Sequence, residues 1–174
     1  MEPNFHAFQV IAEVALGIIG FSAILIGLSH THDGFRPPDQ FRIQLLIYSS
    51  VGAMLCSLLP FAIFAKDNAS EGSWFFACGI MFVYSLAGLV NFPRRMLLLR
   101  ANGFTHLFPF KLFIYQTGIL LLISTISLLL VLGNTEFLTQ FSPSLRGKLY
   151  VLCLLLFLGQ SFMAFIRTMF YRVD

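Results

Sequence analysis

The chain has 174 residues and a mean hydropathy of +0.83, with 57% hydrophobic and only 11% charged residues. Soluble domains carry roughly 25% charged residues, so this composition excludes a cytosolic enzyme, a nucleic-acid-binding module and a secreted disulfide scaffold. We expect an integral membrane protein whose first partner is the lipid bilayer, with no nucleic-acid partner.

Five long runs without a charged side chain divide the sequence, each 18 to 24 residues in length. About 20 apolar residues cross a hydrocarbon layer of about 30 Å as a helix, so five runs predict five transmembrane helices. The sequence therefore predicts an all-α, polytopic helical bundle that forms a single transmembrane domain over residues 1–174. The expected spans lie near 8–28, 42–65, 73–92, 111–133 and 146–167.

An acidic residue lies inside the first predicted span. Glu13 is about two helical turns from the nearer surface, and a charged side chain at the centre of a span costs roughly 2.5–3.5 kcal/mol on insertion scales. At helical spacing it shares one stripe with Gln9, Gly17 and Gly20, and glycines let another backbone approach closely. We expect this stripe to point into the bundle or into a subunit interface.

Two roles are open for Glu13. Its carboxylate can line an ion or proton site, or it can be a protonated or hydrogen-bonded group that fixes helix packing. For the second role, Tyr150 and Lys148 lie at a similar depth in the predicted topology. The insertion cost alone does not distinguish these roles.

The first span ends in a polar turn that contains three side chains able to bind a metal. His30, His32 and Asp33 suit a divalent ion such as zinc. A solvated turn is the commoner explanation for such a short cluster, so we predict no metal site and no cofactor. Known catalytic motifs such as His-Glu-x-x-His are missing from the sequence, and an enzyme is not expected.

Small hydroxyl and amide side chains recur inside the later spans. In membrane helices such residues usually pack and form hydrogen bonds between helices, and less often they line an aqueous path. Both roles are open for Ser49, Ser57, Asn91, Gln116 and Gln160.

A segment in which arginines alternate with apolar side chains follows the third span. After Pro93, we expect residues 94–101 to form a short helix in the membrane interface. The arginines at this end of the bundle either contact lipid phosphates or together form a cationic inner mouth. The candidates for that mouth are Arg42, Arg94, Arg95 and Arg167.

Lysine and arginine are divided unequally between the two predicted sides of the membrane. Eight lie on the side that holds the C-terminus and three on the side that holds the N-terminus. Because cytoplasmic loops carry an excess of Lys and Arg, the N-terminus is predicted outside and the C-terminus in the cytoplasm.

Three segments of the first two predicted helices resemble a pattern that recurs in small bacterial inner-membrane proteins of unassigned function. They are IAEVALGIIGFS at 11–22, FRIQLL at 41–46 and SLLP at 57–60. The resemblance implies a multi-pass protein of the bacterial inner (plasma) membrane and carries no catalytic residue. It places Glu13, Arg42 and Pro60 in one recurring frame.

The small-residue faces and the short loops predict a homo-oligomer. The leading hypothesis is a channel-like, passive pathway for an ion or small solute, with Glu13 in its outer half and the arginines at its inner mouth. The alternative is a non-catalytic structural or accessory subunit of a larger membrane complex, docked through the glycine stripe.

Overall fold

The structure, a computed structural model, describes residues 5–29, 37–64, 71–133 and 142–170. All regular secondary structure in these residues is α-helical, and each helix contains a span long and apolar enough to cross a membrane. The predicted all-α architecture is confirmed, and the five apolar helices support a multi-pass membrane protein. The helices are α1 (Phe5–Ser29), α2 (Pro37–Ile63), α3 (Glu71–Ala101), α4 (Phe110–Leu132) and α5 (Pro143–Phe170).

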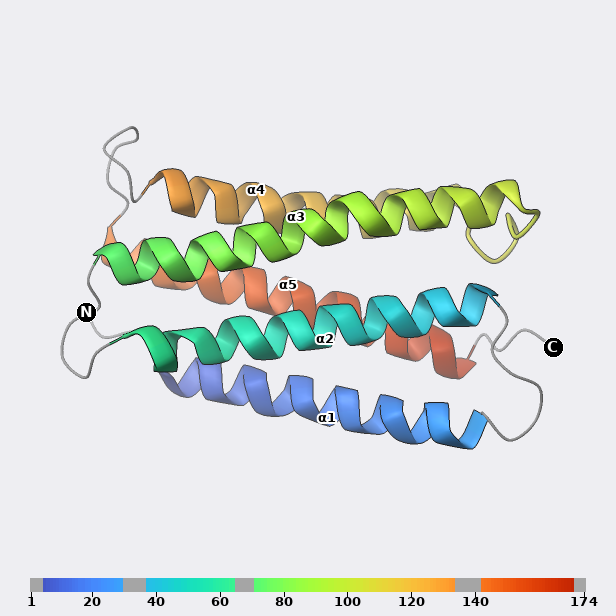
Figure 1. Cartoon of the computed structure of the whole chain (residues 1–174), viewed down its shortest axis with the longest axis horizontal. Helices are drawn as coiled ribbons and strands as arrows, with labels where there is room; N and C mark the ends of the chain where they lie inside the picture. Colours follow the sequence, from blue (N-terminus) through green and yellow to red (C-terminus); the bar gives the residue numbers. More distant parts are fainter. Residues whose placement is uncertain (1–4, 30–36, 65–70, 134–141, 171–174) are drawn as a thin grey trace.

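Successive helices run in opposite directions along the long axis of the bundle (Figure 1). The helix α1 lies at one edge and packs against α2 and α5, whereas α3 and α4 pack together at the opposite edge. The helix α5 contacts α1, α2 and α4, so the last helix in the sequence joins the two edges. Because α1 begins at one end of the bundle and α5 ends at the other, the first and last described residues lie at opposite ends of the bundle.

Large apolar and aromatic side chains fill the centre of the bundle. Phe8, Tyr150 and Phe157 are almost completely buried, and the rings of Phe8 and Tyr150 lie 5.7 Å apart in an edge-to-face contact. By contrast, large apolar side chains such as Phe21 and Val83 are exposed on the outside. An exterior of this kind fits lipid, because an apolar surface of this size is rare on soluble monomers.

Local sequence signals set two of the helix ends. The helix α5 begins at Pro143, and the Leu145 N–H donates to the Ser142 hydroxyl at 3.4 Å as an N-cap. At the end of α3, Gly103 has a φ of 95°, and the Phe104 N–H donates to the Leu99 carbonyl at 3.2 Å. This Schellman arrangement requires the left-handed conformation that glycine adopts most easily.

The structure does not show the separate interfacial helix expected at 94–101. The helix α3 continues through Pro93 to Ala101, so these residues are its last two turns. A proline removes one backbone hydrogen bond, but a helix held by neighbouring helices can tolerate that loss within a membrane. At about 1.5 Å per residue, the 31 residues of α3 are longer than a hydrocarbon layer of about 30 Å.

A second proline lies within α2, which continues past Pro60 to Ile63. Because proline has no N–H, the carbonyl of Cys56 lacks the donor that residue 60 would normally supply. The Tyr150 hydroxyl of α5 donates to that carbonyl at 2.6 Å. A side chain of a neighbouring helix thus replaces the missing backbone donor.

Candidate functional site

The polar stripe of α1 lies on the outside of the bundle. Gln9, Glu13, Gly17 and Gly20 are all exposed, and we call these four residues the α1 outer face. The Gln9 Nε2 donates to the Glu13 Oε1 at 2.9 Å. A Cβ added at either glycine would meet no atom of the chain within 4 Å, so the surface beside the carboxylate is open.

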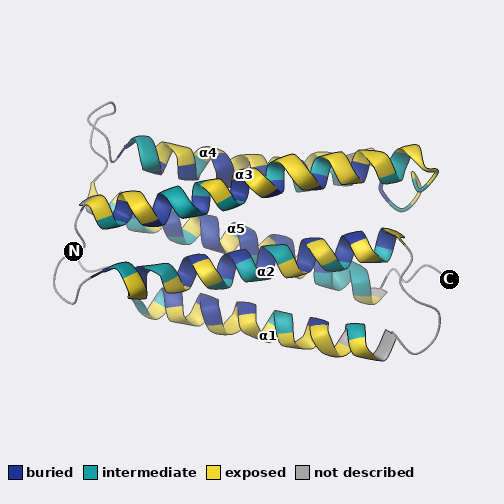
Figure 2. Cartoon of the chain, in the orientation of Figure 1, coloured by how far each residue is buried: buried dark blue, intermediate teal, exposed yellow. Residues whose placement is uncertain are grey.

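The opposite side of α1 makes the contacts with the rest of the chain. Phe8, Ile11 and Ala15 are buried there, on the side that Figure 2 shows turned toward α2. The hydroxyl of Tyr150 donates to the Cys56 carbonyl, so the expected contact from Tyr150 to Glu13 is not formed. Lys148 is exposed on α5, and the ion pair found in the described residues joins Arg42 to Asp39 instead. Within one chain, Glu13 therefore has Gln9 as its partner.

The small hydroxyl residues lie inside the bundle. Ser49 and Ser57 are fully buried on α2, and the Ser57 hydroxyl donates to the Met54 carbonyl at 2.8 Å. The hydroxyls of Ser50 and Ser161 are hydrogen-bonded to each other and join α2 to α5. Such pairs hold helices together, and they show contacts that the spacing of single serines did not reveal.

A second set of serine hydroxyls lies between α3 and α4. The Ser124 hydroxyl donates to the Ser85 hydroxyl at 3.1 Å, and the Ser127 hydroxyl donates to the Ile123 carbonyl at 2.7 Å. All three serines are buried. Asn91 of α3, in contrast, is exposed and donates from Nδ2 to the Ala87 carbonyl of its own helix at 2.9 Å.

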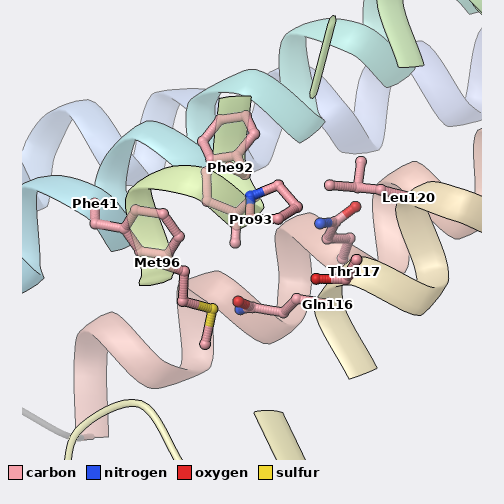
Figure 3. A pocket seen from close by; sticks show the side chains of 9 residues that line it. Phe41, Phe92, Pro93, Met96, Gln116, Thr117 and Leu120 are labelled. Carbon is pink, nitrogen blue, oxygen red and sulfur yellow. The ribbon is translucent and has the colours of Figure 1, made fainter. Parts of the chain in front are cut away.

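The structure brings Gln116 and Gln160 to one small cavity. Gln160 is 2% exposed, and neither atom of its amide has a hydrogen-bond partner in the described part of the chain. The Oε1 of Gln116 is buried and also has no partner there. Figure 3 shows the Gln116 side chain extending from α4 toward Met96 of α3. The lining residues are Phe41, Leu45, Phe92, Pro93, Met96, Gln116, Thr117, Leu120 and Gln160.

Three arginines contact the loop that joins α3 to α4, at the end of the bundle where α1 ends. Arg42 is 3% exposed, and its Nη1 lies 3.3 Å from the Asp39 Oδ1. Its guanidinium carbon lies 5.9 Å from the centre of the Phe108 ring. Arg100 donates to the Phe108 carbonyl at 2.7 Å, and Arg167 donates to the Leu107 carbonyl at 2.9 Å. These contacts fix the loop against α2, α3 and α5.

The remaining two arginines of the predicted mouth are exposed. Arg95 donates to the side-chain carbonyl of Gln44, which joins the ends of α2 and α3. Arg94 lies beside it in the sequence and is exposed to the surroundings. Of the four candidates, Arg42 and Arg167 thus contact the interior of the protein, whereas Arg94 and Arg95 lie at its surface.

Two tyrosines form a contact between α2 and α3 that was not predicted from the sequence. Tyr48 of α2 and Tyr84 of α3 stack with their ring centres 4.4 Å apart, and each hydroxyl donates to the backbone carbonyl of the other residue. Each ring also covers a glycine of the opposite helix, Gly88 beneath Tyr48 and Gly52 beneath Tyr84. A repeated Tyr-Ser-x-x-Gly pattern at 48–52 and 84–88 was the available signal.

The candidate metal ligands His30, His32 and Asp33 lie outside the described residues. Within the residues that are described, no group of three or more His, Cys, Asp or Glu side chains is arranged to hold a metal ion.

Comparison with protein-family models, curated proteins and solved structures finds no match for this chain. The resemblance of its first two helices to small bacterial inner-membrane proteins therefore stays a prediction. The candidate sites have to be interpreted from their own geometry.

Proposed function

We propose that copies of this chain associate in a bacterial inner (plasma) membrane through the α1 outer face and form a channel-like, passive pathway for an ion or small solute. The observation that carries the proposal is the exposure of Glu13 and Gln9 on the outside of an apolar helix. Each copy is non-catalytic and contributes its carboxylate to a path that lies between copies.

The energetic reason is the cost of leaving this face in lipid. A charged side chain at the centre of a span costs roughly 2.5–3.5 kcal/mol on insertion scales, and such residues usually face a protein interior or a water-filled cavity. Glu13 has no such environment within its own chain, because the buried side of α1 is the opposite one. A second copy, or water in a shared path, removes this cost.

The same face is chemically suited to pairing with itself. The Gln9 amide uses one N–H for Glu13, so its second N–H and the second oxygen of the carboxylate are available to another copy. In a two-fold arrangement, each Gln9 can donate to the Glu13 of its partner. Gly17 and Gly20 present no side chain, which permits close approach of two α1 helices.

A path between copies is favoured over one through a single bundle. The centre of the bundle is closed by large buried side chains, including Tyr150 and Phe157. The cavity beside Gln160 has only about 10 Å³ open to the centre of a water molecule. Space for permeation must therefore come from the assembly.

The orientation follows from the basic residues. Arg42, Arg94, Arg100 and Arg167 lie at the end of the bundle where α1 ends and α2 begins. By the positive-inside rule we assign this end to the cytoplasm, so in this proposal the start of α1 and Glu13 lie in the outer half of the membrane.

Ion flux into proteoliposomes tests the proposal. Wild-type protein should carry a flux of at least one of protons, sodium, potassium or chloride above that of empty liposomes, and Glu13→Gln should change its rate or selectivity while the oligomer persists. The matched control is Thr125→Val, which removes an exposed polar group from α4, away from α1. An absence of flux for every ion, from folded and oligomeric protein, would contradict a pathway.

The closed interior also favours a second candidate, a structural or accessory subunit of a larger membrane complex. In that case the α1 outer face binds a helix of another membrane protein. Glu13→Gln should then mainly weaken association, and a stoichiometric partner should co-purify with the wild type and be lost with the variant.

A further inference from the structure

The cavity between α2, α3, α4 and α5 contains polar groups that have no hydrogen-bond partner in the described residues. Both amide atoms of Gln160 and the Oε1 of Gln116 have no hydrogen-bond partner in the described residues, although Gln160 is 98% buried. Buried polar groups in folded proteins are nearly always hydrogen-bonded, either to protein atoms or to ordered water. We therefore expect a small polar ligand to be hydrogen-bonded to these groups.

The wall formed by α3 contains a proline inside the helix. Pro93 lines the cavity and has no N–H, so the Leu89 carbonyl, one turn earlier on the same face of α3, lacks its intrahelical donor. At the other in-helix proline, Pro60, the protein supplies a donor from Tyr150 to the carbonyl of Cys56. No such side-chain donor to Leu89 is found in the described residues.

We propose that this cavity holds one ordered water molecule that joins Gln160 of α5 to Gln116 of α4 beside Pro93. About 10 Å³ is open to the centre of a water molecule, which is close to the minimum of about 10–15 Å³ that one water requires. The water donates to the carbonyl oxygens of the two glutamines and accepts from the Gln160 amide. This site is separate from the α1 outer face and does not depend on the proposed pathway.

The chemistry of the unbonded groups favours water over a metal cation. A cation is bound by acceptors alone, whereas the unbonded set contains the Gln160 Nε2 donor as well as acceptors. A water molecule satisfies both kinds of group. No carboxylate lines the cavity to neutralise a cation.

Radiolytic footprinting of the full chain in lipid nanodiscs tests this site. An X-ray pulse produces hydroxyl radicals from water, so a buried side chain is oxidised when bound water lies next to it. Met96 lines the cavity and is 1% exposed, whereas Met81, on the same helix, is 0% exposed and does not line it. Mass spectrometry should find Met96 oxidised in the wild type and Met81 protected.

Removal of the amide should remove the water. In Gln160→Leu, oxidation of Met96 should fall to the level of Met81, and Gln116→Leu provides the same readout if the first variant does not fold. Equal protection of both methionines in the wild type, or unchanged Met96 oxidation in folded variants, would overturn the proposal. The melting temperature should be equal in sodium, potassium and choline salts, and a rise with one cation would replace water by that ion.

Discussion

Two tyrosines and two glycines join α2 to α3 near the middle of the bundle. The Tyr84 hydroxyl donates to the Tyr48 carbonyl at 2.7 Å, and the stacked rings fill the space above Gly52 and Gly88. A Cβ added at Gly88 would lie 2.7 Å from Cε1 of Tyr48. The ring cannot move aside easily, because its hydroxyl is hydrogen-bonded and its face is stacked.

Gly88→Ala should therefore destabilise the protein by about 1–3 kcal/mol, the usual cost of overpacking. The free energy of unfolding, measured by denaturation in bicelles, checks this expectation. Gly118→Ala is the matched control, since a Cβ at that exposed position of α4 meets nothing within 4 Å. Equal stability of the two variants would show that the tyrosine contact does not constrain Gly88.

At the level of single residues, the sequence predicted that Glu13 shares a stripe with Gln9 but not the direction in which that stripe faces. Helical spacing groups Gln9, Glu13 and Gly17 on one stripe, yet it does not say which other helix lies opposite. That choice depends on the packing of α1 against α2 and α5 through Phe8 and Ala15. The contact expected between Tyr150 and Glu13 is not formed for the same reason.

The helices themselves were largely predictable. The runs without a charged side chain located all five helices. The continuation of α3 through Pro93 was not predictable, because local sequence rules treat proline as a breaker and neighbouring helices override them. The position of Gln116 and Gln160 at one cavity also depends on how α4 and α5 pack, which no spacing within either helix reveals.

The proline inside α2, Pro60, makes a second stability test possible. Tyr150→Phe removes the donor to the Cys56 carbonyl and should cost about 1 kcal/mol, the typical net value of one hydrogen bond. In a Pro60→Ala background the N–H of residue 60 is restored, so the same change should cost less.

A double-mutant cycle in bicelles measures the difference. A coupling energy of at least about 0.5 kcal/mol is expected for residues that share one acceptor. Strict additivity of Tyr150→Phe and Pro60→Ala would mean that the tyrosine does not compensate for the missing backbone donor.

The whole molecule combines an interior filled by large side chains with a carboxylate, Glu13, exposed on the outside of α1. The loop between α3 and α4 is fixed by Arg42, Arg100 and Arg167, and its Phe108 is fully buried beneath Arg42. Buried serines join α2 to α5 and α3 to α4. We therefore propose the α1 outer face, which carries the exposed carboxylate of Glu13, as the surface for assembly.

Disulfide cross-linking in lipid bilayers tests this assembly most directly. Cys56, Cys78 and Cys153 are free and buried, so a cysteine introduced on the surface is the reactive one. Gly17→Cys places it on the α1 outer face. Val83→Cys is the matched control, since Val83 is 66% exposed and lies as far from the start of α3 as Gly17 lies from the start of α1.

On oxidation, Gly17→Cys should form a covalent dimer, and the yield of this dimer should not fall when the protein is diluted with lipid before oxidation. Val83→Cys should stay monomeric. Adding Glu13→Leu and Gln9→Leu to Gly17→Cys should reduce the dimer, because the polar reason for pairing is removed. Equal cross-linking at both positions, or a folded Gly17→Cys protein that never cross-links, would contradict association through α1.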